Sequence, residues 1–138
     1  MISVLIDTNV VLDYAEEREG FFEAVKKVFE MIKQNEMTGC ISASAVTDIF
    51  YFLQKRYKDS GVAMTLLKKL TRILKILTVN HEIIETAFDS DMDDFEDAVQ
   101  AAAAKSCGVD IVVTRDKSGF QNSGLQVLSP EEFLATVE

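Results

Sequence analysis

Residues Ile2–Asp13 read I-S-V-L-I-D-T-N-V-V-L-D, and the expected architecture rests on this segment. The aliphatic run Ile2–Ile6 is short and ends abruptly at Asp7, which is typical of a strand buried on both faces in a parallel sheet. The residues that follow have helix-capping side chains, and a helix can begin at Val10. We therefore expect a carboxylate where a buried strand emerges, although Asp7 alone would also be an ordinary helix N-cap. In open α/β sheets, ligands bind at this edge.

The length and composition predict one compact domain over residues 1–138. The 138 residues are 48% hydrophobic and include a single proline, so a packed core is expected rather than a disordered chain. Cys40 and Cys107 lie in apolar segments without metal-ligand spacing and are expected to be buried thiols of a reducing compartment. The N-terminal apolar run is too short for export or membrane spanning. We expect a cytoplasmic protein that does not contact a membrane.

Helical and strand patterns alternate along the chain. Strands are expected at Ile2–Ile6, Cys40–Ser42, Ile76–Val79, Ile111–Thr114 and Leu125–Leu128. Helices are expected from Val10, over Phe21–Lys33, from Ser44 to Tyr57, from Asp59 or Ser60, over Glu82–Phe88, over Asp94–Cys107, and after the capping box at Ser129–Glu132. Gly39 is expected to break the second of these helices, Met64 to point inward from the fourth, and Asn80 to cap the fifth. Without hairpin signals, this order predicts an α/β fold with a mainly parallel sheet between two helical layers.

The net charge of −9 is unevenly distributed. Glu82–Asp97 contains eight acids and no Lys or Arg, whereas Lys55–Lys75 contains seven basic residues and one acid. Each run alone is compatible with a solvated helical face. Together they are compatible with an acidic metal pocket beside a basic flank, on which Lys55, Arg56, Lys68, Lys69 and Arg72 are candidates to hold a nucleic-acid backbone.

Acidic residues recur at unusual positions. Asp48 lies in an otherwise apolar helical stretch, where an unpaired buried carboxylate would cost several kcal/mol, unless it faces solvent. Asp94 and Asp97 are three residues apart and share a helical face, although Asp94 also fits a helix cap. Asp116 follows the fourth expected strand, as Asp7 follows the first. Four acids, Asp7, Asp48, Asp97 and Asp116, can therefore converge at one sheet edge.

Clustered carboxylates repel one another unless cations neutralise them, and their oxygens suit Mg²⁺ or Mn²⁺. A bound metal can make water nucleophilic and stabilise charge on a phosphodiester. Other chemistries lack support, because His81 is the single histidine and fits a helix start, and no glycine-rich phosphate loop is present.

The pattern resembles the PIN domain, the metal-dependent ribonuclease fold that includes VapC-type toxins of toxin–antitoxin pairs. The residues that carry the resemblance are I-D-T-N-V-V-L-D at Ile6–Asp13, Asp48 in its apolar helix, D-F-E-D-A-V-Q-A-A-A at Asp94–Ala103, and V-T-R-D at Val113–Asp116. These blocks are spread in order over nearly the whole chain.

The resemblance implies a five-stranded parallel sheet between helices and an endoribonuclease activity with Mg²⁺ or Mn²⁺. Asp7 and Asp97 match the family's surest metal ligands, and Asp48 and Asp116 match acids that bind the metal directly or through water. Asn9 and Thr114 match positions that steady these acids by hydrogen bonds, and we add Asp94 to that supporting set. The resemblance also implies a homodimer and a small antitoxin protein that blocks the acidic groove.

Two positions depart from the family pattern. Asp48 stands where glutamate is frequent, and in the block often written T-R-N-x-x-D-F, Asp116 takes the asparagine place and Gly119 the aspartate place. An inactive RNA-binding or scaffold version of the fold is therefore a second reading. A Mg²⁺-dependent phosphohydrolase is a third, disfavoured because Asn9 stands where a phosphoaspartate enzyme would have a second aspartate.

Overall fold

The computed structural model describes residues 1–137 and contains a five-stranded sheet of order β3-β2-β1-β4-β5. All four neighbouring pairs of strands are parallel. The strands are β1 (Ser3–Ile6), β2 (Thr38–Ser42), β3 (Lys75–Leu77), β4 (Ile111–Val113) and β5 (Gln126–Leu128). The expected parallel α/β fold is confirmed, and the segment that begins the chain forms the central strand.

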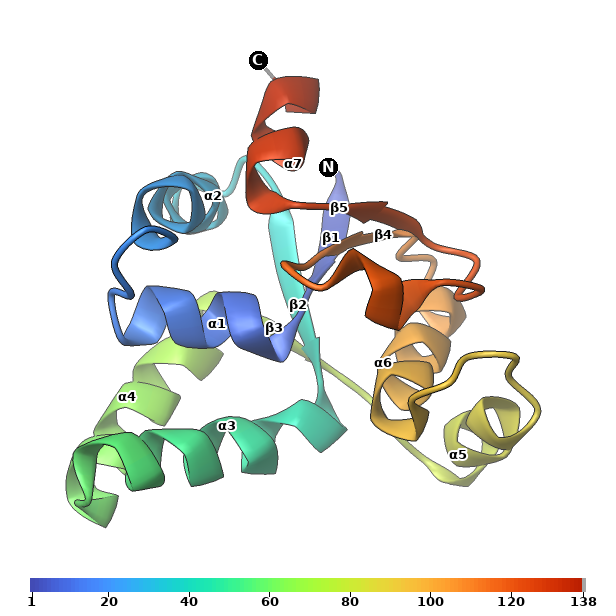
Figure 1. Ribbon diagram of the computed structural model, residues 1–138, viewed down its shortest axis with the longest axis horizontal. Helices are drawn as coiled ribbons and strands as arrows, with labels where there is room; N and C mark the ends of the chain where they lie inside the picture. The colour runs from blue at the N-terminus through green and yellow to red at the C-terminus, as the bar shows by residue number, and fades with distance from the viewer. Residues whose placement is uncertain (138) are drawn as a thin grey trace.

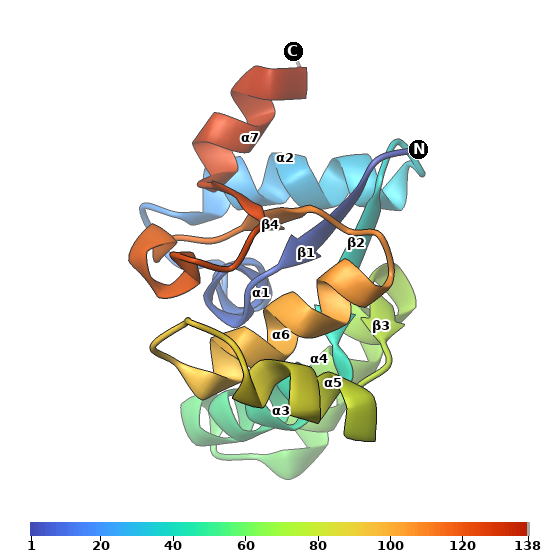
Figure 2. The ribbon, with the colours of Figure 1, turned by 90° about the vertical axis from the view of Figure 1, so that its right-hand side faces the viewer.

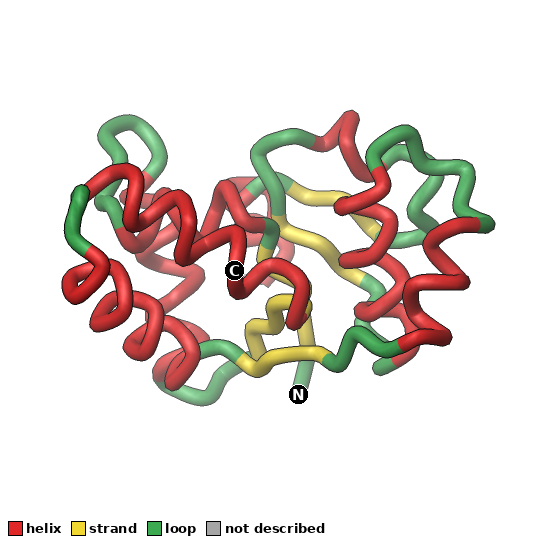
Figure 3. Tube along the Cα trace, turned by 90° about the horizontal axis from the view of Figure 1, so that it is seen from below, coloured by secondary structure: helices red, strands yellow, loops and turns green. Residues whose placement is uncertain are grey.

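Helices cover both faces of the sheet (Figures 1 and 3). They are α1 (Thr8–Ala15), α2 (Phe22–Lys33), α3 (Ala43–Tyr57), α4 (Ser60–Ile73), α5 (His81–Phe88), α6 (Phe95–Ser106) and α7 (Pro130–Val137), with a 3₁₀ turn at Lys117–Phe120. One apolar core contains residues of α1, α2, α3, α4 and α7, and the other contains residues of α5 and α6. Figure 2 shows α5 and α6 side by side in front of the sheet. The fold is therefore a three-layer sandwich.

The alternation of side chains along β1 explains its unbroken apolar sequence. Val4 and Ile6 belong to the core beneath α1–α4, whereas Leu5 belongs to the core beneath α5 and α6. Because successive strand residues point to opposite faces, a strand between two helical layers needs apolar residues at every position. All three are fully buried.

Three expectations about individual residues were wrong. Gly39 does not break α2, which ends at Lys33, but lies within β2 where a Cβ would come 2.4 Å from Ile32 Cδ1. Glycine is present there because the strand passes close beneath the helix. Met64 is 42% exposed because α4 turns Ala63, Leu67 and Leu70 inward. Cys107 is exposed at the end of α6, and only Cys40 is buried.

The strand order places a topological switch at the centre of the sheet. From β1, the chain proceeds to β2 and β3 on one side and later returns to β4 and β5 on the other. The carboxyl ends of β1 and β4 therefore form the crevice in which open parallel sheets bind ligands. Within residues 1–137, no helix is both long and apolar enough to span a bilayer.

Candidate active site

Asp7 lies at the carboxyl end of β1, and its carboxylate is held from two sides. Oδ1 accepts a 2.8 Å hydrogen bond from the Thr8 backbone N–H, which makes Asp7 the N-cap of α1. Oδ2 accepts a 2.7 Å hydrogen bond from the Thr114 hydroxyl at the end of β4. Burial raises the pKa of Asp7, and both hydrogen bonds oppose that shift by favouring the ionised form. Asp7 is thus both a helix cap and a fixed carboxylate at the crevice.

Asp116 is joined to Asp7 through the same hydroxyl group. The Asp116 backbone N–H donates to Thr114 Oγ1 at 3.0 Å, so this oxygen accepts from Asp116 while it donates to Asp7. The Ser118 hydroxyl in turn donates to Asp116 Oδ1 at 2.7 Å. The turn after β4 therefore fixes one oxygen of Asp116.

Asp97 is contributed by the first turn of α6. Asp94 caps this helix, and its Oδ1 accepts a hydrogen bond from the Asp97 backbone N–H at 2.9 Å. The Asp97 carboxylate accepts a hydrogen bond from Gln100 Nε2 at 3.4 Å, one turn further along. Burial, followed by the charges of Asp7 and Asp94, raises the pKa of Asp97 to about 7. Both burial and the neighbouring carboxylates therefore oppose ionisation of Asp97.

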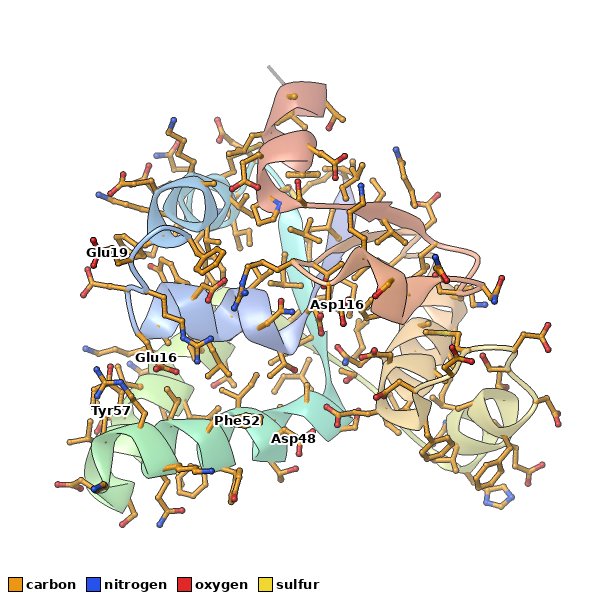
Figure 4. The ribbon with its side chains drawn as sticks, in the orientation of Figure 1. Glu16, Glu19, Asp48, Phe52, Tyr57 and Asp116 are labelled. Atoms are coloured by element: carbon orange, nitrogen blue, oxygen red, sulfur yellow. The ribbon has the colours of Figure 1, made fainter. Side chains whose placement is uncertain are left out.

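Glu96 on α6 and Asp48 on α3 are near enough for Asp48 to influence the ionisation of Glu96. Burial and then the contact with Asp48 raise the pKa of Glu96 to about 7, with Asp94 and Asp7 adding to the shift. Asp48 is half-buried on α3 and does not face solvent freely. Figure 4 shows Asp48 on α3 below Asp116, which follows β4. Five acids thus lie at this end of the sheet. Asp7 and Asp116 are joined through Thr114, Glu96 is near Asp48, and Asp97 lies on the first turn of α6.

The space above Gly119 is the point where two of these acids meet. A Cβ on Gly119 would lie 2.8 Å from Asp97 Oδ2 and 3.1 Å from Asp116 Oδ2. The two oxygens therefore lie close over Gly119, and the absence of a side chain there lets both carboxylates approach this turn. Carboxylate oxygens that converge in this way are the donors that a hard divalent cation prefers.

The supporting polar residues are satisfied to different extents. Thr114 makes the predicted hydrogen bond to Asp7. Within residues 1–137, the Asn9 side chain makes no hydrogen bond to the four predicted acids. Asn9 Oδ1 and Gln100 Oε1 are buried without a partner. Within the same residues, no three His, Cys, Asp or Glu side chains lie in an arrangement that could hold a metal ion. The carboxylates are close enough to shift one another's pKa values, but they do not form a closed coordination shell.

The basic residues predicted from the sequence separate into two groups. Lys69 and Arg72 line a cavity between α1, α2 and α4 that shares no residue with the acids, and Lys68 is exposed on the same helix. Lys55 and Arg56 are exposed on α3, the helix that carries Asp48. Only the α3 pair is therefore on an element of the acidic crevice.

Several participating residues were not identified from the sequence. Glu96, Gln100 and Gly119 contact or flank the predicted acids. The i, i+3 spacing of Asp97 and Gln100 was a signal for their contact, because such residues share a helix face. The role of Gly119 needed the fold, because a turn glycine has no sequence feature that reveals what surrounds it.

Comparison with known proteins supports the fold and identifies a family. Residues 3–118 match the model of the PIN domain family. Ribonuclease VapC1 of Aquifex aeolicus is 28% identical over 135 residues, which covers 94% of this chain and 92% of the relative. The structure of VapBC2 from Rickettsia felis bound to a promoter DNA fragment superposes with a TM-score of 0.75 at 14% identity, covering 93% of this chain and 98% of that chain. DNA-bound VapBC from Salmonella typhimurium gives 0.72 at 16% identity, covering 94% and 99%.

Proposed function

Since the chain belongs to the PIN domain family, we propose that it is an endoribonuclease that uses Mg²⁺ or Mn²⁺ to hydrolyse RNA phosphodiesters at the β1–β4 crevice. The observation that supports this proposal best is the close approach of Asp97 Oδ2 and Asp116 Oδ2 over Gly119, which brings two carboxylates from different elements together. The similarity to Ribonuclease VapC1 supports RNA as the substrate class.

Four acids would hold the cation: Asp7, Asp97, Asp116 and Asp48. A bound divalent cation supplies a nucleophilic water at neutral pH and stabilises charge on the phosphodiester. Thr114 keeps the Asp7 carboxylate directed into the crevice by its 2.7 Å hydrogen bond. Asp97 has a pKa raised to about 7, so it can be ionised for ligation without leaving the ordinary pH range.

The reaction forms one P–O bond to water and breaks one P–O bond to a ribose oxygen, which takes up a proton. Asp94 supports the site indirectly, because its carboxylate orients the first turn of α6 from which Asp97 projects.

The comparisons also support a partner. The structural neighbours include VapBC toxin–antitoxin complexes, and we infer that this chain, like them, pairs with a small antitoxin protein. We infer a homodimer of single-domain chains, as the family resemblance implies. A cytoplasmic location is consistent with the free thiols of Cys40 and Cys107.

Cleavage of a panel of labelled RNAs with Mn²⁺ or Mg²⁺ tests the proposal, with wild type compared against Asp7→Asn. Metal-dependent cutting by wild type and none by the variant is the expected result. Cutting that persists in Asp7→Asn would remove this carboxylate from the reaction. Absence of both cutting and calorimetric Mn²⁺ binding would favour the non-catalytic scaffold instead.

A further inference from the structure

Three arginines and two acids form a continuous series of charged contacts beside the acidic crevice. Arg115 donates to Asp13 from Nε at 2.6 Å and from Nη2 at 3.2 Å. Arg18 contacts Asp13 from Nη1 at 3.4 Å and Glu16 from Nη2 at 3.0 Å. Arg56 Nε lies 3.5 Å from the other Glu16 oxygen. We call these five residues the arginine chain.

The acids of the arginine chain are buried and the arginines are not. The side chains of Asp13 and Glu16 are 0% and 6% exposed, whereas those of Arg115, Arg18 and Arg56 are 30%, 35% and 61% exposed. The acids therefore hold the guanidinium groups from beneath. Each guanidinium has about five N–H donors and uses one or two of them here, so donors remain on the exposed edges. Such fixed guanidinium groups suit phosphate oxygens.

One end of the arginine chain adjoins the proposed active site, and the other lies further along α3. Arg115 lies between Thr114 and Asp116 in sequence, and Arg56 follows Asp48 by eight residues on α3. In Figure 4, Glu16 lies at the end of α1 remote from Asp116, with Asp48 and Phe52 along the neighbouring α3. The arginine chain thus extends from the acids along the side where α1 and α3 pack.

Phe52 adds an aromatic ring to this surface. It lies four residues after Asp48 and four before Arg56, so the three side chains share one face of α3. Phe52 is 44% exposed, and the adjacent Tyr51 packs edge-on against its ring. An exposed ring between a phosphodiester-cleaving site and an arginine is suited to stacking an unpaired nucleobase.

We propose that Arg18, Arg56 and Phe52 bind single-stranded RNA as it leaves the acidic crevice, with the two arginines on phosphates and Phe52 on a base. The inference rests on the proposed ribonuclease function and adds the path and strandedness of the substrate. Single-stranded RNA fits because stacking on Phe52 requires a base free of its pair.

The test is the salt dependence of KM for cleavage of an unstructured RNA by Arg18→Ala, Arg56→Ala and Phe52→Ala. Each arginine variant should raise KM about tenfold and reduce the slope of log(1/KM) against log salt by about 0.7, the value for one phosphate contact on a single strand. Phe52→Ala should raise KM about tenfold with an unchanged salt slope. The kcat should stay within about twofold of wild type, because none of the three is among the acids.

Lys27→Ala is the charge-matched control, since Lys27 lies on α2 beside Ile2 and Leu134, away from the acids. If wild type cleaves RNA and the arginine variants match Lys27→Ala in KM and slope, the inference fails while the proposed function stands. If wild type cleaves no RNA, the proposed function fails, and filter binding of the same RNA tests the arginine chain separately.

Two further controls keep the result interpretable. Arg18→Ala leaves two buried acids short of a partner, so its melting temperature is measured, and Arg56→Ala, which removes a mostly exposed side chain, carries the test if Arg18→Ala does not fold. A Phe52→Ala protein with wild-type KM that changes from dimer to monomer would overturn the stacking role, because it would place Phe52 between two copies of the chain.

Discussion

The pKa of Asp97 responds both to burial and to the other carboxylates at this end of the sheet. Asp97 is half-buried, and its carboxylate neighbours on β1, α6 and the turn after β4 all oppose its ionisation. A carboxyl group in that position holds its proton to an unusually high pH unless a cation replaces it. The same residue therefore links metal binding, pH and fold stability.

The metal-free protein should lose stability as pH rises from 5 to 8. The pKa of Asp97 is about 7 in the folded protein and 3.8 for an unperturbed aspartate. Between these pH values the folded state binds more protons than the unfolded state, so the free energy of unfolding falls as pH rises. Asp97→Asn should remove part of this dependence and raise the melting temperature at pH 8 by about 3 °C. Calorimetric melting in EDTA at both pH values measures this, with the exposed Asp93→Asn as control. A lower melting temperature for Asp97→Asn at pH 8 would show that its charge stabilises the fold.

Gly119→Ala should weaken Mn²⁺ binding about tenfold with little change in stability. The added methyl group would crowd Asp97 Oδ2 and Asp116 Oδ2 and push them apart, and both contacts are with the ends of side chains that can move aside. Titration calorimetry measures the affinity. Gly61→Ala on α4 is the matched control, because its Cβ would meet only Asp59. Equal Mn²⁺ affinities for wild type and Gly119→Ala would mean that no cation binds between these two oxygens.

At the level of elements, the ends of β1, β4 and α6 are joined by side-chain hydrogen bonds rather than by backbone pairing alone. Thr114 links β4 to Asp7, and Asp94 caps the helix that carries Asp97. Arg115 adds a fork onto Asp13 in α1 and packs its guanidinium 4.0 Å above the ring of Phe21. These contacts fix the relative positions of the acids.

Asp94→Asn should retain most activity, whereas Asp97→Asn should lose on the order of 100-fold or more. Asparagine at 94 keeps an oxygen that can accept the Asp97 N–H, so the cap survives. Initial rates of RNA cleavage at saturating Mn²⁺ compare the two variants. Equal losses would mean that Asp94 has the direct role assigned to Asp97.

Asp13→Ala should destabilise the fold by about 3 kcal/mol, because it leaves Arg115 without its fully buried counter-ion. Urea denaturation at equilibrium gives this free energy. The control is Lys117→Ala, which removes a solvent-exposed bridge to Glu132 and should cost less than about 1 kcal/mol. Similar costs for both variants would show that the buried pair has no special weight.

On the scale of the whole molecule, the sequence predicts the architecture well because parallel strands between two helical layers must be apolar at every position. The run at Val4–Ile6 and the run at Ile111–Val113 carry that signal, and their ends place Asp7 and Asp116 at one edge. Gly39 was misassigned, since a glycine required for close packing of a helix on a strand resembles a helix breaker.

The predicted site was incomplete for a related reason. The acids could be predicted because carboxylates at strand ends and in apolar helices are costly without a ligand. Three other features depend on distances between elements that are far apart in the sequence. They are the nearness of Glu96 to Asp48, the approach of two carboxylates over Gly119, and the hydrogen bonds from Arg115 to Asp13. Asp13 is fully buried, yet along the sequence it looks like an ordinary helix residue.

The most direct measurement is the product of RNA cleavage with Mn²⁺ in H₂¹⁸O, analysed by mass spectrometry for wild type and Asp7→Asn. Attack by a metal-activated water predicts one ¹⁸O in each new terminal phosphate, dependence on Mn²⁺, and no product from Asp7→Asn. A 2′,3′-cyclic phosphate with a 5′-hydroxyl end, or cutting that proceeds without metal, would contradict hydrolysis at the acidic crevice.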